Sequence, residues 1–148
     1  MDRPKQVYVA GPLFSEHERM YLEQMVTVLA KACSLDPRSD FFLPHRDAGD
    51  VGVSGSTDEI FEADLKALKD AKIVVALLDG QDVDSGTAVE LGIAFVAKKP
   101  IYGLLTDRRA RDPQGRVKIN NMIWGVCREG RRIYASVETL ASALAKEI

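Results

Sequence analysis

The sequence predicts an α/β fold in which a parallel sheet lies between two layers of helices. Short apolar runs alternate with segments of helical period along the 148 residues, a length that suits one domain. The clearest run, residues 73–78, is apolar at every position, which is typical of a parallel strand buried on both faces. Strands that alternate with helices pair in parallel through right-handed crossovers. We therefore expect one domain, residues 1–148, built as a three-layer, flavodoxin-like (Rossmann-like), doubly wound sheet of five strands.

The first two strands and the first helix occupy the N-terminal third of the chain. Residues 7–10 form an apolar run that stops at Gly11-Pro12, which indicates a strand followed by a turn. Residues 16–33 carry apolar side chains at a helical period, and residues 41–44 form the expected second strand. Residues 46–56 hold three glycines and show no period. We expect a loop there that is long for a compact domain, and such loops are usually functional or mobile.

The rest of the chain continues the alternation of helices and strands. Ser56 and Glu59 fit a capping box that opens a helix running to about residue 71. The remaining expected elements are a strand at residues 73–78, a helix from an Asp84 or Ser85 cap to residue 98, strands at residues 100–105 and 132–134, and an amphipathic helix at residues 136–148. Ligands of such sheets bind outside the carboxyl ends of the strands, so that edge is where we expect the site.

Composition and charge exclude several classes of function. Lys and Arg number 20 against 22 Asp and Glu, and the charges are mixed along the chain, so we expect no nucleic-acid partner. The apolar runs are too short to cross a bilayer and the N-terminus lacks a signal peptide, which predicts a cytoplasmic protein with no membrane partner. Cys33 and Cys127 form neither a CxxC motif nor a disulfide framework. His17 and His45 lack a ligand spacing, so we expect no metal and no cofactor.

Glu90 is the only ionisable side chain between residues 85 and 97. A helix this apolar is expected to be buried nearly all round, and a carboxylate on it must be paired, neutral or functional. Helical side chains lean over the preceding turn, where Gly86 leaves room for a ligand. The alternative is a solvated glutamate on the one polar edge of the helix.

Two further acids stand in unusual places. Asp64 interrupts an apolar flank of its helix, and aspartate is a poor helix former. A salt bridge to a distant Lys or Arg would also explain it. Asp84 follows the carboxyl end of the clearest strand, where a plain N-cap is the alternative interpretation.

Carboxylates that converge on one cleft have a specific chemical use. One can attack an anomeric carbon while a second, kept protonated by burial and like-charge repulsion, donates to the leaving group. Tyr8, in the first strand, could orient the attacking carboxylate through its hydroxyl, or it could be a core tyrosine.

Four motifs together resemble the nucleoside 2-deoxyribosyltransferase family. They cover nearly the whole chain in the order of the family, and the aspartate stands six residues before the glutamate in the third. The motifs are Val-Tyr-Val-Ala-Gly-Pro-Leu-Phe at 7–14, Glu-Ala-Asp-Leu at 62–65, Asp-Ser-Gly-Thr-Ala-Val-Glu-Leu-Gly at 84–92 and Asn-Asn-Met-Ile-Trp-Gly at 120–125.

This resemblance implies a role for each acid. Glu90 would be the nucleophile that forms a covalent deoxyribosyl ester, from which an acceptor base takes the sugar with net retention. Tyr8 would hold that carboxylate in position. Asp64 would protonate the departing base, and Asp84 would bind the substrate.

The resemblance also implies an assembly and further substrate contacts. Similar enzymes are homo-oligomers, dimers that build hexamers, with sites completed across the interface. Asn120 and Met122 match residues that reach a neighbouring subunit's site, and Phe14 would form an aromatic wall for the base. The remaining expected substrate contacts are Gly11, Ser85 and Gly86.

Two other functions remain open on the sequence. A related hydrolase transfers the sugar of 2-deoxynucleoside 5-monophosphates to water and resembles this chain in fold and nucleophile. Such proteins hold the phosphate with a serine at the position of Asp84, whose charge would repel a phosphate, although Ser15, Ser85 and Arg19 are nearby. The second alternative is a non-catalytic nucleoside-sensing or nucleotide-sensing module. The loop at residues 46–56 is where residues that select the base are expected.

Overall fold

The computed structural model describes residues 3–49 and 55–148 as a five-stranded, all-parallel sheet with helices on both faces. The strand order is β2-β1-β3-β4-β5, as the alternation of strands and helices predicts. In chain order the elements are β1 (Val7–Ala10), α1 (Glu16–Cys33), β2 (Phe41–Phe42), α2 (Pro44–Asp47), α3 (Thr57–Asp70), β3 (Ile73–Leu77), α4 (Ser85–Val96), β4 (Ile101–Leu104), η1 (Arg108–Ala110), α5 (Asn121–Val126), β5 (Ile133–Tyr134) and α6 (Val137–Leu144).

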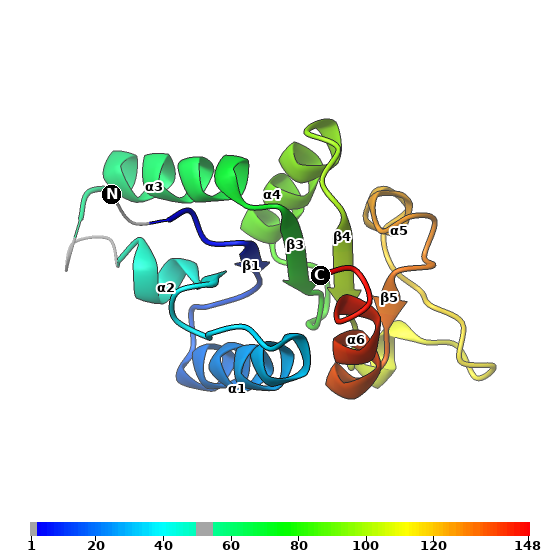
Figure 1. Cartoon of the computed structure of the whole chain (residues 1–148). Coiled ribbons are helices and arrows are strands. Elements are labelled where there is room, and N and C mark those ends of the chain that lie inside the picture. Colours follow the sequence, from blue (N-terminus) through cyan, green and yellow to red (C-terminus); the bar gives the residue numbers. More distant parts are fainter. Residues whose placement is uncertain (1–2, 50–54) are drawn as a thin grey trace.

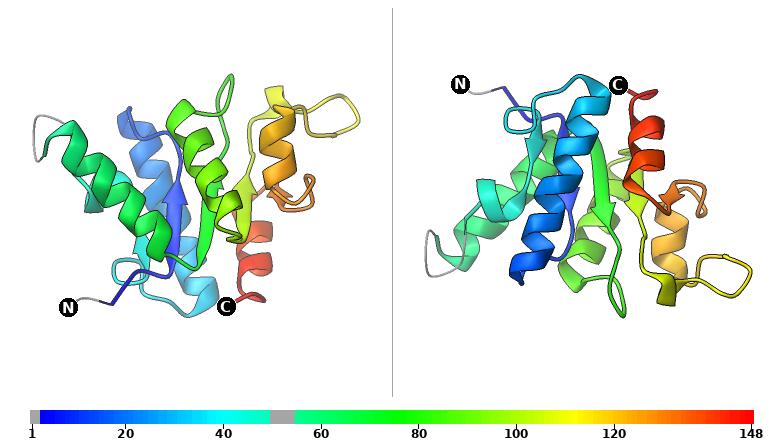
Figure 2. Two further views of the ribbon diagram at one scale, coloured as in Figure 1. Left: turned by 90° about the horizontal axis from the view of Figure 1, so that it is seen from above. Right: turned by 90° about the horizontal axis from the view of Figure 1, so that it is seen from below.

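The two helical layers enclose two separate cores. Helices α3, α4 and α5 cover one face of the sheet, and α1 and α6 cover the other (Figures 1 and 2). Successive side chains of a strand point to opposite faces. Accordingly, Val7 and Val9 of β1 pack in the core beneath α1 and α6, whereas Tyr8 and Ala10 pack in the core beneath α3 and α4. This alternation directs Tyr8 to the face that carries α4.

Side-chain caps fix where the helices that flank the carboxyl edge begin. Ser56 accepts a hydrogen bond from the Glu59 backbone at the start of α3, and the Glu59 carboxylate accepts one from the Ser56 backbone. This confirms the expected capping box. The side chain of Asp84 caps α4.

The segment after β2 differs from the loop expected from residue 46. Helix α2 occupies residues 44–47, with Pro44 in the first turn, where its fixed φ suits a helix. The Asp47 carboxylate accepts a hydrogen bond from the Leu43 backbone N–H at 2.9 Å. Four residues are too few to display a helical period, so the pattern could not predict α2. The part of the expected loop at residues 50–54 lies outside the described residues.

Other differences concern helix α5 and the ends of α4 and α6. The sequence pattern did not predict α5, whose first turn begins where the Asn120 side chain accepts a hydrogen bond from the Met122 N–H at 2.9 Å. Helix α4 ends at Val96 rather than at residue 98, and α6 ends at Leu144 rather than at residue 148.

Helix α4 is not buried nearly all round, contrary to the expectation from its apolar sequence. Leu91 and Ala94 face the sheet and are buried, whereas Val89, Phe95 and Val96 are 60%, 57% and 81% exposed. The outer face of α4 is therefore an apolar surface without a partner in the described part of this chain.

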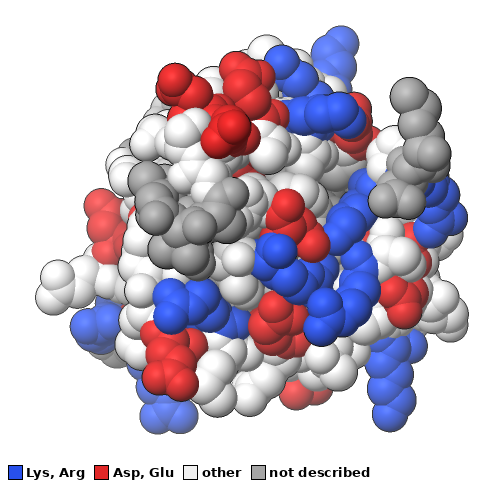
Figure 3. Space-filling model, turned by 90° about the vertical axis from the view of Figure 1, so that its left-hand side faces the viewer, with Lys and Arg blue, Asp and Glu red and all other residues white. Residues whose placement is uncertain are grey.

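Charges of both signs share the surface beside β2. On the face shown in Figure 3, Lys and Arg side chains are interspersed with Asp and Glu side chains rather than gathered in one stripe. The pairs Lys5–Asp47 and Arg46–Asp47, at 2.8 and 3.1 Å, lie in this region. Among the residues that the structure describes, no helix is long and apolar enough to cross a membrane.

Candidate active site

A cavity of about 430 Å³ lies at the carboxyl edge of the sheet, beside β1 and the N-terminus of α4. In an open parallel sheet this edge offers a crevice where neighbouring connections leave toward opposite faces, as they do after β1 and β3. The lining residues are Gly11, Leu13, Phe14, Pro44, His45, Gly49, Ile60, Asp64, Asp84, Gly86, Thr87 and Glu90. All three acids singled out in the sequence are among them.

Tyr8 and Glu90 form the central hydrogen bond of the site. The Tyr8 hydroxyl donates to Glu90 Oε1 at 2.5 Å. Tyr8 is fully buried, and its ring stacks on Phe42 of β2 with centroids 5.4 Å apart, so the hydroxyl has little freedom. Strand packing therefore holds one oxygen of the carboxylate, and Oε2 is left for another partner.

The environment of Glu90 favours its neutral form. Burial is the largest cause and raises its pKa from 4.5 to about 7, and the negative charges of Asp64 and Asp84 add to this. The Tyr8 hydrogen bond acts in the opposite direction and lowers the pKa, because it stabilises the carboxylate. The pKa of Tyr8 is raised by burial and by Glu90, so the phenol keeps its proton and remains the donor. A half-ionised carboxyl group near neutral pH is suited to nucleophilic work.

Asp64, on α3, supplies a second acid in the same cavity. Its Oδ1 is buried and has no hydrogen-bond partner among residues 3–49 and 55–148. No Lys or Arg of that part of the chain pairs with Asp64, so the salt bridge considered from the sequence is not formed. Burial raises its pKa from 3.8 to about 6, which favours a carboxyl group that can donate a proton.

Asp84 caps α4, which confirms the capping interpretation from the sequence, and it also lines the cavity. Its Oδ2 accepts hydrogen bonds from the backbone N–H and the hydroxyl of Thr87, at 2.9 and 3.2 Å. Gly86 leaves this corner open, because a Cβ there would lie 3.2 Å from the same oxygen.

The other expected contacts divide between this cavity and the rest of the surface. Gly11 and Phe14 line the cavity, and Phe14 is 72% exposed. Ser85 is exposed and does not line it. Asn120 caps α5 and borders a separate cavity of about 590 Å³, while Met122 is 76% exposed. Within one copy of the chain, Ser85, Asn120 and Met122 are thus not brought to Glu90.

Several lining residues were not singled out in the sequence, above all His45. It lies in α2, three residues after β2 ends, and this closeness to a strand end, where ligands are expected, was the available signal. Ile60 stands one turn before Asp64, and Thr87 is buried against Asp84. In the described residues no group of three His, Cys, Asp or Glu side chains is placed to hold a metal ion.

Comparisons with known proteins give a consistent family. A model of the family described as nucleoside 2-deoxyribosyltransferase matches residues 7–137. A solved structure of a conserved protein from Enterococcus faecalis is 26% identical, with a TM-score of 0.82, and the match covers 97% of this chain and 99% of that one. None of the curated proteins compared with the chain matches it.

Two solved structures with described activities share the fold. A 2-deoxyribosyltransferase from Bacillus psychrosaccharolyticus is 23% identical, with a TM-score of 0.67 and coverage of 92% of this chain and 90% of that one. A CMP N-glycosidase from Clostridium botulinum is 20% identical, with a TM-score of 0.58 and coverage of 97% and 100%. The activities named for these neighbours differ, so the fold alone does not choose between them.

The substitution Glu90→Gln is expected to change how stability depends on pH. The folded pKa of about 7 exceeds the unfolded value of 4.5, so between them the folded protein binds a proton that the unfolded chain releases. The free energy of unfolding of the wild type therefore falls as pH rises through this window. Because Gln does not titrate, its free energy of unfolding does not fall in this way. The free energy of unfolding of the variant, relative to that of the wild type, should therefore rise by on the order of 2 kcal/mol between about pH 4 and about pH 8.

Urea denaturation of both proteins at the two pH values measures this difference. Glu62→Gln, on the exposed side of α3, is the control and should show no such gain. An equal effect of Glu90→Gln at both pH values would contradict the account of Glu90.

Proposed function

The chain belongs to the nucleoside 2-deoxyribosyltransferase family, and we propose that it moves 2-deoxyribose from a 2-deoxynucleoside to a free nucleobase through a covalent ester on Glu90. The observation that carries the proposal is the hydrogen bond from Tyr8 to Glu90 Oε1, at 2.5 Å, in a cavity that also holds Asp64. One fixed carboxylate and one buried acid are the groups that glycosyl transfer with retention requires.

In the first step Glu90 Oε2 attacks the anomeric carbon. The bond from this carbon to the base nitrogen breaks, its electron pair stays on the base, and Asp64 gives the base a proton. Tyr8 keeps Oε1 in place and orients Oε2 during the attack. The product of this step is a deoxyribosyl ester of Glu90 together with the free base.

In the second step a nitrogen of the incoming base attacks the same carbon. The ester bond to Glu90 breaks, its electron pair returns to the carboxylate, and Asp64 takes the proton that the incoming base loses. Two inversions give net retention. A 2-deoxy sugar reaches the oxocarbenium-like transition state readily, so one nucleophile and one acid suffice.

The two carboxyl groups share the required protonation between them. Burial raises the pKa of Glu90 to about 7 and that of Asp64 to about 6, so between these two values the pair binds about one proton, which in the free protein lies mainly on Glu90. A base nitrogen beside Asp64 accepts a hydrogen bond only from the protonated acid. Bound substrate therefore favours the form with the proton on Asp64 and the charge on Glu90.

The surroundings of Asp84 favour a neutral nucleoside over a nucleotide. A helix N-terminus attracts phosphate, but at α4 the Asp84 carboxylate already accepts from the Thr87 N–H and adds a negative charge. The Nη1 group of Arg19 is also engaged, since it donates to the carbonyl oxygens of Leu13 and Phe14 at 2.9 and 3.0 Å. The nucleotide hydrolase is therefore the second candidate, and a non-catalytic sensing module is the third.

We also infer a homo-oligomer, a dimer or a hexamer, whose sites are completed across the interface. The apolar outer surface of α4 continues onto the neighbouring α5, where Met122 and Trp124 are 76% and 42% exposed. Exposed apolar surface of this kind marks an interface. In such an assembly Asn120 and Met122 would approach the site of a neighbouring subunit.

Transfer is tested by incubating the protein with a 2-deoxynucleoside and a different free base. A new 2-deoxynucleoside is the expected product, and Glu90→Ala should lower the rate by about a thousandfold or more, because the first step loses its nucleophile. Glu62→Ala, an exposed carboxylate on α3, should leave the rate unchanged. Free deoxyribose or its 5-phosphate as the sole sugar product would refute transfer in favour of hydrolysis. Binding without turnover would favour the sensing module.

Asp84→Ser should shift the preference from nucleoside toward nucleoside 5-monophosphate by about tenfold, since it removes a charge beside the α4 N–H groups and keeps a capping hydroxyl. The ratio of kcat/KM for the two substrates measures the preference. Asp82→Ser, an exposed acid of the same loop, is the matched control and should change it little. An unchanged ratio in Asp84→Ser would show that the charge argument is wrong.

Val96→Asp should dissociate the assembly, because it buries a charge in the inferred interface. Sedimentation velocity is expected to give an oligomer for the wild type and a smaller species for this variant. Val28→Asp introduces the same change on α1, at a side chain that is 38% exposed in the opposite layer, and should keep the oligomer. A monomeric wild type would contradict the inference.

A further inference from the structure

Two buried side-chain atoms lack a hydrogen-bond partner in the described part of the chain, and both belong to residues that line the same cavity. They are Asp64 Oδ1 and His45 Nδ1. Buried polar groups are nearly always paired, so each exception calls for an explanation. Asp64 already has a role in the proposed function. His45 has none, and its side chain is only 9% exposed.

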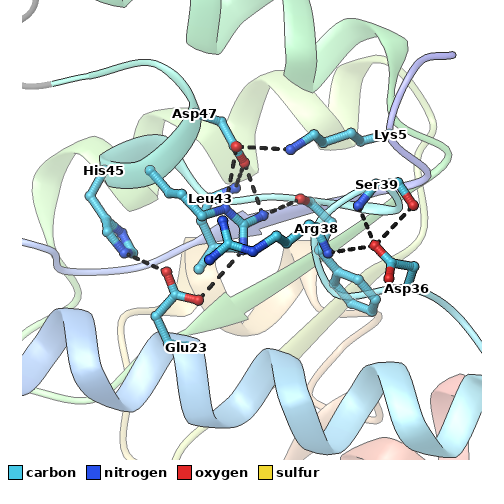
Figure 4. A network of polar contacts seen from close by, with 10 residues as sticks. Lys5, Glu23, Asp36, Arg38, Ser39, Leu43, His45 and Asp47 are labelled. Atoms are coloured by element: carbon cyan, nitrogen blue, oxygen red, sulfur yellow. Dashed lines mark hydrogen bonds and ion pairs between the residues drawn. The ribbon is translucent and has the colours of Figure 1, made fainter. Parts of the chain in front are cut away.

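The surroundings of His45 fix which ring nitrogen carries the hydrogen. Nε2 lies 3.2 Å from Glu23 Oε1 on α1, and a carboxylate can only accept (Figure 4). The hydrogen therefore sits on Nε2. In the neutral ring Nδ1 then presents a lone pair and acts as a hydrogen-bond acceptor.

The rest of the polar network around α2 is already paired. Arg46 donates to the Phe41 carbonyl at 2.7 Å and contacts both Glu23 and Asp47. Asp47 in turn accepts from the Leu43 N–H and pairs with Lys5. These contacts hold α2 and the imidazole in one orientation. They leave Nδ1 as the one acceptor of this network with no donor among residues 3–49 and 55–148.

We propose that His45 is a specificity-determining residue that accepts a hydrogen bond from an exocyclic amino group of the nucleobase. This inference rests on the proposed function, because it takes the base to lie in the cavity shared by Asp64 and His45. Protonated Asp64 donates to a ring nitrogen of the base, and His45 Nδ1 accepts from the neighbouring amino group. Adenine offers this acceptor and donor side by side at N7 and its amino group.

A base that carries a carbonyl group in place of the amino group cannot donate a hydrogen bond to His45. Hypoxanthine is the matched case, because along the edge that carries N7 it differs from adenine by an oxo group in place of the amino group; its other change is a hydrogen on N1. Its oxygen would face the lone pair of Nδ1, and both acceptors would stay unpaired. A site built to hydrogen-bond a substrate group discriminates strongly against an analogue that lacks it.

The test is the ratio of kcat/KM for deoxyadenosine over deoxyinosine. For the wild type we expect about tenfold or more in favour of deoxyadenosine, and for His45→Phe a ratio near unity. A ratio between two substrates on one variant is independent of how much of the protein is folded. Glu23→Gln removes the carboxylate that keeps the hydrogen on His45 Nε2, and it leaves the residues that line the cavity unchanged. This variant should give an intermediate ratio.

His17→Phe is the matched control, because His17 is exposed and lies outside this cavity, and it should keep the wild-type ratio. The inference is overturned if the wild type prefers deoxyinosine, or if His45→Phe keeps the wild-type ratio, as a purely structural histidine would. Dissociation constants of the free bases adenine and hypoxanthine separate this result from a failure of the proposed function. If the wild type turns over neither nucleoside but binds adenine about tenfold more tightly than hypoxanthine, and His45→Phe does not, base recognition stands while transfer fails.

Discussion

The burial of the Glu90 carboxyl group beside the Tyr8 hydroxyl is the constraint on which the rest of the site depends. Burial makes the charged form costly, and the tyrosine recovers part of that cost through one short hydrogen bond. Tyr8 can do this because β1 is a central strand, paired with β2 on one side and β3 on the other.

The Tyr8–Glu90 pair is supported by a glycine at the point where the chain after β1 packs closely against the core. At Gly11 a Cβ would lie 3.0 Å from Leu22 Cδ2 and 3.1 Å from Leu77 Cβ, so the chain can turn away from β1 at this point only with glycine or with displacement of the core. Arg19 then ties the carbonyl oxygens of the following turn to α1. Phe14, which lines the cavity, therefore stands on a fixed turn rather than on a free loop.

The sequence predicted the parts of the site that obey a simple rule, namely an acid in an apolar helix or a residue at a strand end. Glu90 and Asp64 stood out because each interrupts an apolar pattern, and the structure brings both into one cavity. Helix α2 and the orientation of His45 could not be predicted in this way. They depend on tertiary contacts with Glu23, which lies 22 residues earlier in the chain. The burial expected for α4 was wrong, since the apolar composition of a helix does not show which of its faces pack against the core.

The central claim is that Glu90 carries the sugar, and the most direct measurement is the mass of the protein during turnover. The protein is mixed with a 2-deoxynucleoside without an acceptor base, quenched in acid and digested. We expect the added mass of one deoxyribosyl group on the peptide that contains Glu90, and no added mass in Glu90→Ala. Steady turnover with unmodified protein, or the added group on a different side chain, would contradict it.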